Sequence, residues 1–153
     1  MLTQLLKDEE LNGLLSKQSV LSLDVILTDQ QVNLYALRMD AALDFATANG
    51  FERAVAEHIT AHPDTRHVML IAHPINWIDT TGAEAFGRVR GQLDDRGITL
   101  HLVGIKLPVE NLLRLAGHLE ESPRLHLYRT EMDALRAADA LKEAAIEQSL
   151  NPA

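Results

Sequence analysis

The sequence of 153 residues contains no cysteine, few aromatic residues and no long apolar run. Without cysteine there is no disulfide, no thiolate metal site and no cysteine nucleophile. The apolar stretches fall well short of the roughly 18–20 residues that cross a bilayer. Lys7, Asp8, Glu9 and Glu10 charge the first turns, a pattern that argues against a secretory signal. These absences predict a soluble chain that is compatible with the cytoplasm.

Basic residues are also scarce, because 14 Lys and Arg stand against 22 Asp and Glu, giving a net charge of −8. Neutralising phosphates requires clustered basic side chains, so this balance argues against a general nucleic-acid binder. Hydrophobic residues make up 46% and charged residues 24%, which is the composition of a globular protein. The length suits a single core. We therefore expect one acidic globular domain.

The first part of the chain predicts a helix followed by a β-hairpin. Leucines recur at helical spacing over residues 3–17, which predicts an appended helix. Residues 20–27 and 32–39 have strand composition, and the polar residues 28–31 between them have hairpin-loop length. A short apolar piece follows at 43–45. We place an N-terminal helical extension at 1–18, the domain at 19–147 and a frayed tail at 148–153.

After residue 50, helical and strand patterns alternate. The periodicity predicts helices over 51–62, 82–95, 108–116 and from 130 onward, with strands over 68–72, 98–103 and 125–128. The run 68–72 is apolar without alternation, which is typical of a central parallel strand covered on both faces. Each helix has a predicted buried face. Those of the last two helices consist of Val109, Leu112, Leu113 and Ala116, and of Met132, Leu135, Ala138 and Leu141. The alternation predicts an α/β fold with a mixed, mainly parallel β-sheet and helices packed chiefly on one side.

The most informative stretch, Ile75 to Glu84, reads I-N-W-I-D-T-T-G-A-E and joins the central strand to the next helix. Thr81 and Glu84 have the T-x-x-E spacing of a capping box. In one interpretation this is only a helix start, with a cap worth about 1 kcal/mol. In the other, Thr81 is an exposed hydroxyl at a phosphorylation or anion site, because helix N-termini favour negative charge. Asp79 and Glu84 would oppose an added phosphate by like-charge repulsion.

The stretch Asp79-Thr80-Thr81-Gly82 resembles the D-[ST]-[ST]-G signature of STAS domains, the sulphate-transporter and anti-sigma-antagonist domains. The resemblance runs from about Leu21 to Leu141. It includes the opening hairpin, residues 43–48, the central strand, residues 97–102 and the Pro108 helix that ends at Gly117. The resemblance implies a STAS-like α/β fold.

Two branches of this family remain open. Residues 76–84 are similar to the version in SulP-type anion permeases, commonly I-N-F-I-D-x-x-G-A-E, and residues 104–109 to a permease Lys-x-Pro-Val element. We favour this branch. It implies a non-enzymatic cytoplasmic regulatory domain of a sulphate or other anion transporter, at the inner face of the cell membrane. Its partners would be the permease membrane domain or a second STAS domain. The alternative is a stand-alone anti-anti-sigma regulator, in which a serine/threonine kinase-type anti-sigma factor phosphorylates Thr81 and the partner is released.

Both branches place the working surface on one loop. We predict Thr81, with Thr80, as the switch or phosphorylation site. The partner or anion-binding loop consists of Asn76, Trp77, Asp79, Thr80, Thr81, Gly82 and Glu84. The resemblance also allows an anion or nucleotide to bind near this loop, and it implies no cofactor.

Several other signals do not predict a catalytic or metal site. His58 and His62 have the i, i+4 spacing that lets two imidazoles share a metal, but no third ligand accompanies them in a recognisable motif. We interpret them as helix-border histidines. The acidic pairs Asp94-Asp95 and Glu120-Glu121 have the character of solvated helix ends. No nucleophile elbow, G-x-G-x-x-G or Walker-type loop is present, so we predict no enzyme.

Overall fold

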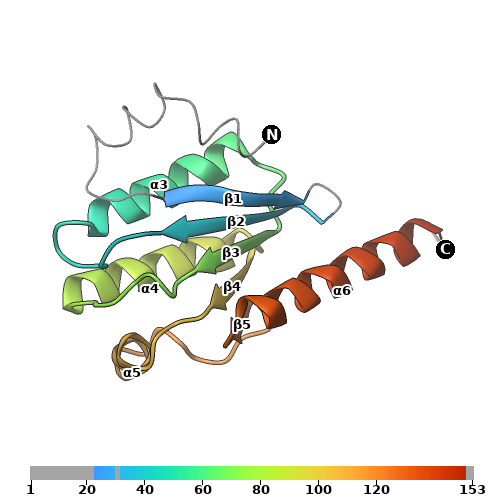
Figure 1. The fold of residues 1–153 in the computed structure, drawn as a ribbon. Helices are drawn as coiled ribbons and strands as arrows, with labels where there is room; N and C mark the ends of the chain where they lie inside the picture. The colour runs from blue at the N-terminus through green and yellow to red at the C-terminus, as the bar shows by residue number, and fades with distance from the viewer. Residues whose placement is uncertain (1–22, 30–31, 151–153) are drawn as a thin grey trace.

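The computed structural model describes residues 23–29 and 32–150 (Figure 1). Their elements follow in the order β1 (Leu23–Asp29), β2 (Leu34–Met39), α3 (Ala48–Ala61), β3 (His67–Ile71), α4 (Thr80–Asp95), β4 (Thr99–Val103), α5 (Leu107–Leu115), β5 (Leu125–Tyr128) and α6 (Glu131–Leu150). The helix predicted over 3–17 lies outside the described residues. No helix in the described part of the chain has the length and hydropathy of a membrane span.

The strands form one sheet in the order β1-β2-β3-β4-β5. β1 is antiparallel to β2, and the other neighbouring pairs are parallel. The predicted N-terminal hairpin and mainly parallel sheet are therefore confirmed. Because β2, β3, β4 and β5 all point the same way, the loops that follow them gather at one end of the sheet. We call this end the carboxyl edge.

The hairpin differs from the prediction in its bounds. Thr28 and Asp29, predicted as loop, belong to β1 and pair with Tyr35 and Leu34. Asn33, directly before β2, adopts a positive φ of 52°, a conformation that asparagine tolerates better than most residues. β2 consequently begins at Leu34 rather than at residue 32.

The helices divide unequally between the two faces of the sheet (Figure 1). Helices α3, α4 and α5 cover one face, and their apolar side chains build the main core with residues such as Phe51, Phe86 and Leu113. Helix α6 lies on the other face over a smaller cluster that includes Met69, Val103 and Ala134. The prediction that helices pack chiefly on one side is confirmed.

The predicted buried stripe of α6 is wrong in its first turns. Met132 and Leu135 are 58% and 47% exposed, whereas Ala134 between them is 2% exposed. The row that faces the sheet continues through Ala138, Leu141 and Ala145. The small alanine side chains leave room for the helix backbone to lie near the sheet. They therefore face the sheet, and the larger Met132 and Leu135 do not. The helix continues through Leu150.

Helix α5 is fixed to the carboxyl edge by a buried carboxylate. Glu110 is 4% exposed and accepts hydrogen bonds from Arg129 Nη1 at 2.6 Å and from Arg114 Nε at 3.0 Å. The hydrogen bond from Arg129 is the main cause that lowers the pKa of Glu110. Ala116, predicted as buried, is exposed because it follows the last helical residue. Gly117, with φ of 80°, supplies the expected left-handed end of the helix.

Candidate interaction site at the β3–α4 turn

The stretch singled out in the sequence forms the connection from β3 to α4 at the carboxyl edge. Ile75 and Ile78 are buried and anchor it to the core. Between them, Asn76 and Trp77 face solvent, and the Trp77 side chain is 54% exposed. This alternation presents part of the predicted loop at the surface while its two isoleucines fix the backbone.

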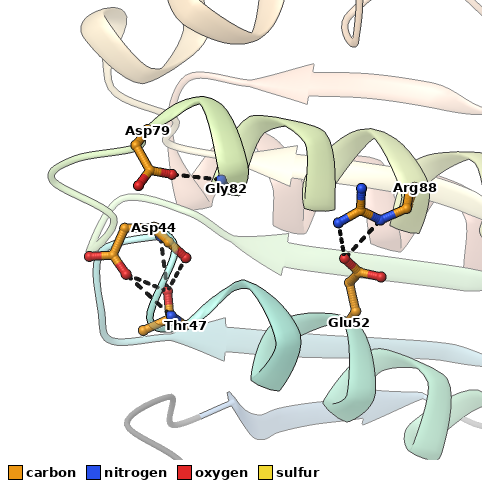
Figure 2. A network of polar contacts seen from close by, with 6 residues as sticks. All are labelled: Asp44, Thr47, Glu52, Asp79, Gly82 and Arg88. Carbon is orange, nitrogen blue, oxygen red and sulfur yellow. Dashed lines mark hydrogen bonds and ion pairs between the residues drawn. The ribbon is translucent and has the colours of Figure 1, made fainter.

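A carboxylate, rather than the predicted threonine, caps helix α4. Asp79 is the N-cap residue, and its Oδ1 accepts a hydrogen bond of 2.7 Å from the Gly82 backbone N–H (Figure 2). The predicted capping box of Thr81 with Glu84 is therefore wrong. The helix begins at Thr80, two residues before the predicted start, which puts Thr81 in the first turn. Asp79 has extended backbone geometry and a short acceptor side chain, the combination that an N-cap requires.

The second oxygen of Asp79 binds a different loop. Asp79 Oδ2 accepts a hydrogen bond of 3.0 Å from the backbone N–H of Phe45, in the β2–α3 loop. The two loops also share backbone hydrogen bonds from Leu43 N–H to Trp77 O at 3.0 Å and from Asp79 N–H to Leu43 O at 3.3 Å. One carboxylate thus fixes both the start of α4 and the position of the neighbouring loop.

Gly82 is required by this close approach. A Cβ atom at position 82 would lie 2.0 Å from the carbonyl oxygen of Leu43, far inside van der Waals contact. The glycine of the motif therefore lets the β2–α3 loop lie directly against the first turn of α4. Gly82 is buried as a result, so it shapes the predicted surface without being part of it.

The hydroxyl and acidic residues of the motif are placed at the surface. Thr80, Thr81 and Glu84 are exposed, and Asp79 is partly exposed. Because Asp79 makes the cap hydrogen bond, the start of α4 does not depend on either threonine hydroxyl. Asn76 is exposed as well, and its Oδ1 accepts a hydrogen bond from Lys106 Nζ in the β4–α5 loop. The motif thus contacts the loops on both sides of it.

The structure adds three surface residues to the predicted loop, namely Phe45, Lys106 and Leu107. Phe45 is 74% exposed in the β2–α3 loop, and Leu107, the first residue of α5, is 62% exposed; both follow strands that neighbour β3 at the carboxyl edge. We call Phe45, Trp77 and Leu107 the edge patch. Lys106 adds a cation beside it. Large apolar side chains that remain exposed at one end of a domain are candidates for an interaction surface.

One sequence signal could have revealed Phe45. Asp44 and Thr47 have the D-x-x-T spacing of a closed polar turn. In the structure, Asp44 Oδ1 accepts hydrogen bonds from the backbone N–H of Thr47 (Figure 2) and from that of Ala46. The Thr47 hydroxyl donates to Ala42 O at 2.7 Å. A turn closed in this way excludes its middle residues from the core, and Phe45 is one of them.

Five of the seven histidines form two clusters away from this edge. His58 and His62 stack with ring centroids 4.5 Å apart and both pack against Tyr35. Burial is the main cause that lowers the pKa of His58 to about 4. In the described ranges, no group of three His, Cys, Asp or Glu side chains is placed to hold a metal ion.

The second cluster, which the sequence did not predict, lies on the α6 face of the sheet. Buried His101 bonds through Nε2 to His67 Nδ1 at 3.0 Å and through Nδ1 to the Tyr128 hydroxyl at 2.9 Å. His126 stacks on His101 with ring centroids 5.3 Å apart. These residues are far apart in the sequence and meet because parallel strands bring them into register.

Solved structures with the same fold come from two kinds of protein. The murine solute carrier 26 family member A9 anion transporter, in its inward-facing state, matches with a TM-score of 0.61 and 21% identity over 71% of this chain and 18% of its own. A sulfate transporter family protein from Wolinella succinogenes has a TM-score of 0.61 and 19% identity, over 76% and 92% of the two chains. A putative anti-sigma factor antagonist from Thermotoga maritima has a TM-score of 0.59 and 15% identity, over the same shares.

These matches establish the fold, and this chain spans less than a fifth of the mammalian transporter it resembles. Comparison with curated protein sequences gave no match. The comparison with protein families identifies the family itself. The family model of the STAS domain matches residues 25–134, which is most of the chain. Those residues include the hairpin, the β3–α4 turn and the first turn of α6. The chain therefore belongs to the STAS domain family, whose members are regulatory or interaction domains.

Proposed function

We propose that this chain is the cytoplasmic regulatory domain of a SulP-type sulphate or anion transporter, and that it acts by protein contact at the carboxyl edge. The observation that carries the proposal is the edge patch. Phe45, Trp77 and Leu107 are large apolar residues that remain exposed, two on loops and one at the start of α5, after three neighbouring strands. Aromatic side chains are enriched among residues that dominate binding energy at protein interfaces.

The sequence of the turn supports the transporter branch. The I-N-W-I-D-T-T-G-A-E stretch and the Lys-x-Pro-Val element at Lys106–Val109 both resemble the permease pattern. In the structure these two elements touch, because Lys106 binds Asn76. The partner that we propose is the membrane domain of the transporter, which would place this surface at the inner face of the membrane.

Photo-crosslinking in the cells that produce the protein tests this assignment. A photoreactive phenylalanine analogue at Trp77 should capture a polytopic anion transporter, identified by mass spectrometry. The same analogue at Leu115, which is 86% exposed at the other end of α5, serves as the matched control and should not capture it. Capture at Leu115 as well as at Trp77, or of no transporter at all, would overturn the proposal.

The exposed threonine favours a second candidate, a stand-alone anti-anti-sigma regulator switched at Thr81. Thr81 is exposed in the first turn of α4 and is not needed for the cap. A phosphate there would gain from the helix dipole and would add about −1.5 to −2 charges beside Asp79 and Glu84. Such a change is large enough to repel a partner that binds the unmodified surface.

Phosphate mapping separates the two candidates. Chain isolated from its own cells should carry phosphate on Thr81 and not on the adjacent Thr80 if it is the switched regulator, and a soluble kinase should replace the transporter in the crosslinked product. Partner binding should then be lost in Thr81→Glu and retained in Thr81→Ala. Unmodified Thr81, or equal binding by both variants, removes the regulator candidate.

A further inference from the structure

Phe45 presents an exposed ring on a backbone that is held in place. Its side chain is 74% exposed. Its backbone N–H donates to Asp79 Oδ2 at 3.0 Å, and the next two N–H groups, of Ala46 and Thr47, both donate to Asp44 Oδ1. An apolar side chain whose backbone is ordered before binding loses less conformational entropy when a partner covers it. Phe45 is therefore organised for contact with a partner.

The Asp79 side chain adds a contact that the backbone alone does not provide. Leu43 and Ile78 form a parallel bridge, with hydrogen bonds from Leu43 N–H to Trp77 O and from Asp79 N–H to Leu43 O. These bonds join backbone atoms only, so they do not depend on which side chain stands at position 79. The Phe45 N–H, in contrast, is bound by the Asp79 carboxylate. The position of Phe45 relative to α4 therefore depends on the chemistry of the side chain at position 79.

Both oxygens of this carboxylate are needed. Asp79 Oδ1 caps α4 by accepting from the Gly82 N–H at 2.7 Å, while Oδ2 accepts from the Phe45 N–H. Asparagine is as good an N-cap as aspartate, but it has one side-chain oxygen, and its NH₂ group only donates. In Asp79→Asn, the oxygen that keeps the cap leaves the NH₂ group facing the Phe45 N–H. One substitution thus separates the cap from the contact with Phe45.

We propose that Asp79 is a positioning residue for the edge patch: it holds Phe45 where a partner at the carboxyl edge contacts the ring, and so raises the affinity of that site. The inference rests on the proposed function, because it requires that the partner binds the edge patch. Asp79 is only partly exposed, and both of its oxygens bind backbone N–H groups within the chain. Its effect on a partner therefore passes through Phe45.

Amide hydrogen exchange in the purified chain tests the positioning. In Asp79→Asn the Phe45 N–H loses its charged acceptor and should exchange at least about tenfold faster. The Gly82 N–H keeps its cap and should exchange as it does in the unmodified protein. Asp79→Ser also keeps a capping oxygen and should give the same pattern without an opposing NH₂ group. Unchanged exchange at Phe45 in a variant that keeps the Gly82 cap would overturn the proposal.

A double-mutant cycle tests whether Asp79 acts through Phe45. The yield of transporter captured by the photoreactive analogue at Trp77 measures binding in the cells that produce the protein. Asp79→Asn should lower this yield several-fold, and Phe45→Ala should lower it by at least as much. The double variant should lose no more than Phe45→Ala alone, because no ring is left to position. Asp95→Asn removes one charge at the exposed C-terminal end of α4 and is the matched control, which should bind normally.

The outcomes of the cycle distinguish this inference from the proposed function. If the unmodified protein captures the transporter and Asp79→Asn captures it equally well, the inference is wrong and the proposed function stands. Losses from Asp79→Asn and Phe45→Ala that add in the double variant also overturn the inference, because Asp79 would then act on the partner without Phe45. No capture by the unmodified protein overturns the proposed function and this inference together.

Discussion

Protonation of the buried His101 should weaken the fold as the pH falls. Burial is the main cause that lowers its pKa to about 3, and the neighbouring His67 and His126 lower it further. In the unfolded chain a histidine has a pKa of about 6.5. Below that value the unfolded state binds a proton that the native state does not, so stability is full above about pH 7 and is lost as the pH falls toward the native pKa.

The size of the effect follows from the distance between the two pKa values. Each pH unit between them costs about 1.4 kcal/mol, so lowering the pH to about 5 should remove about 2 kcal/mol through His101 alone. That is a large share of the about 5–15 kcal/mol that stabilises a typical domain. His58, whose pKa is also lowered, adds to the loss in the same direction.

Urea unfolding at several pH values measures this loss. His101→Gln removes the titrating ring, so its free energy of unfolding should fall by about 2 kcal/mol less than that of the unmodified protein between about pH 7.5 and pH 5. Tyr128→Phe is the control, because it removes one hydrogen bond and keeps the buried imidazole; its pH dependence should persist. Equal pH dependence in His101→Gln and the unmodified protein would refute the reasoning.

Two further predictions concern the start of α4. Gly82→Ala should destabilise the fold by at least about 1–3 kcal/mol, because its Cβ would meet the Leu43 carbonyl, whereas Gly91→Ala, with open space around it, should stabilise the same helix by about 0.5–1 kcal/mol. Thermal unfolding of the pair checks this, and a tolerated Gly82→Ala would show that the loop moves freely. Asp79→Ala should cost about 1–2 kcal/mol in urea unfolding and Thr81→Ala less than about 0.5 kcal/mol. A larger loss of stability in Thr81→Ala than in Asp79→Ala would contradict this prediction and would indicate that Thr81 caps the helix.

The fold was predictable because short-range patterns in the sequence indicate its helices and strands. The apolar run around Val68–Ile71 indicated a strand covered on both faces, and it is the central strand of the sheet. Pro108 and Gly117 marked the beginning and end of α5, because one fixes φ and the other tolerates a positive φ. The alternation of helix and strand then left few topologies open.

The site was predictable in position and not in its contacts. The motif at Asp79–Gly82 indicated the surface turn, but two residues within it satisfied the rules for an N-cap. Asp79 and Thr81 both have side chains that can cap the helix. Asp79 also accepts a hydrogen bond from the Phe45 N–H, in a loop 34 residues away in the sequence. Spacing along the chain contains no information about that donor.

The sequence by itself determined the order of the strands and helices and the left-handed end of α5 at Gly117, because these follow from backbone sterics and short-range periodicity. Tertiary structure alone decided which row of α6 meets the sheet and which residue caps α4. It also brought His101 between His67 and Tyr128. Each of these outcomes depends on groups from separate strands, helices or loops, whose distance in space is fixed only when the layers pack.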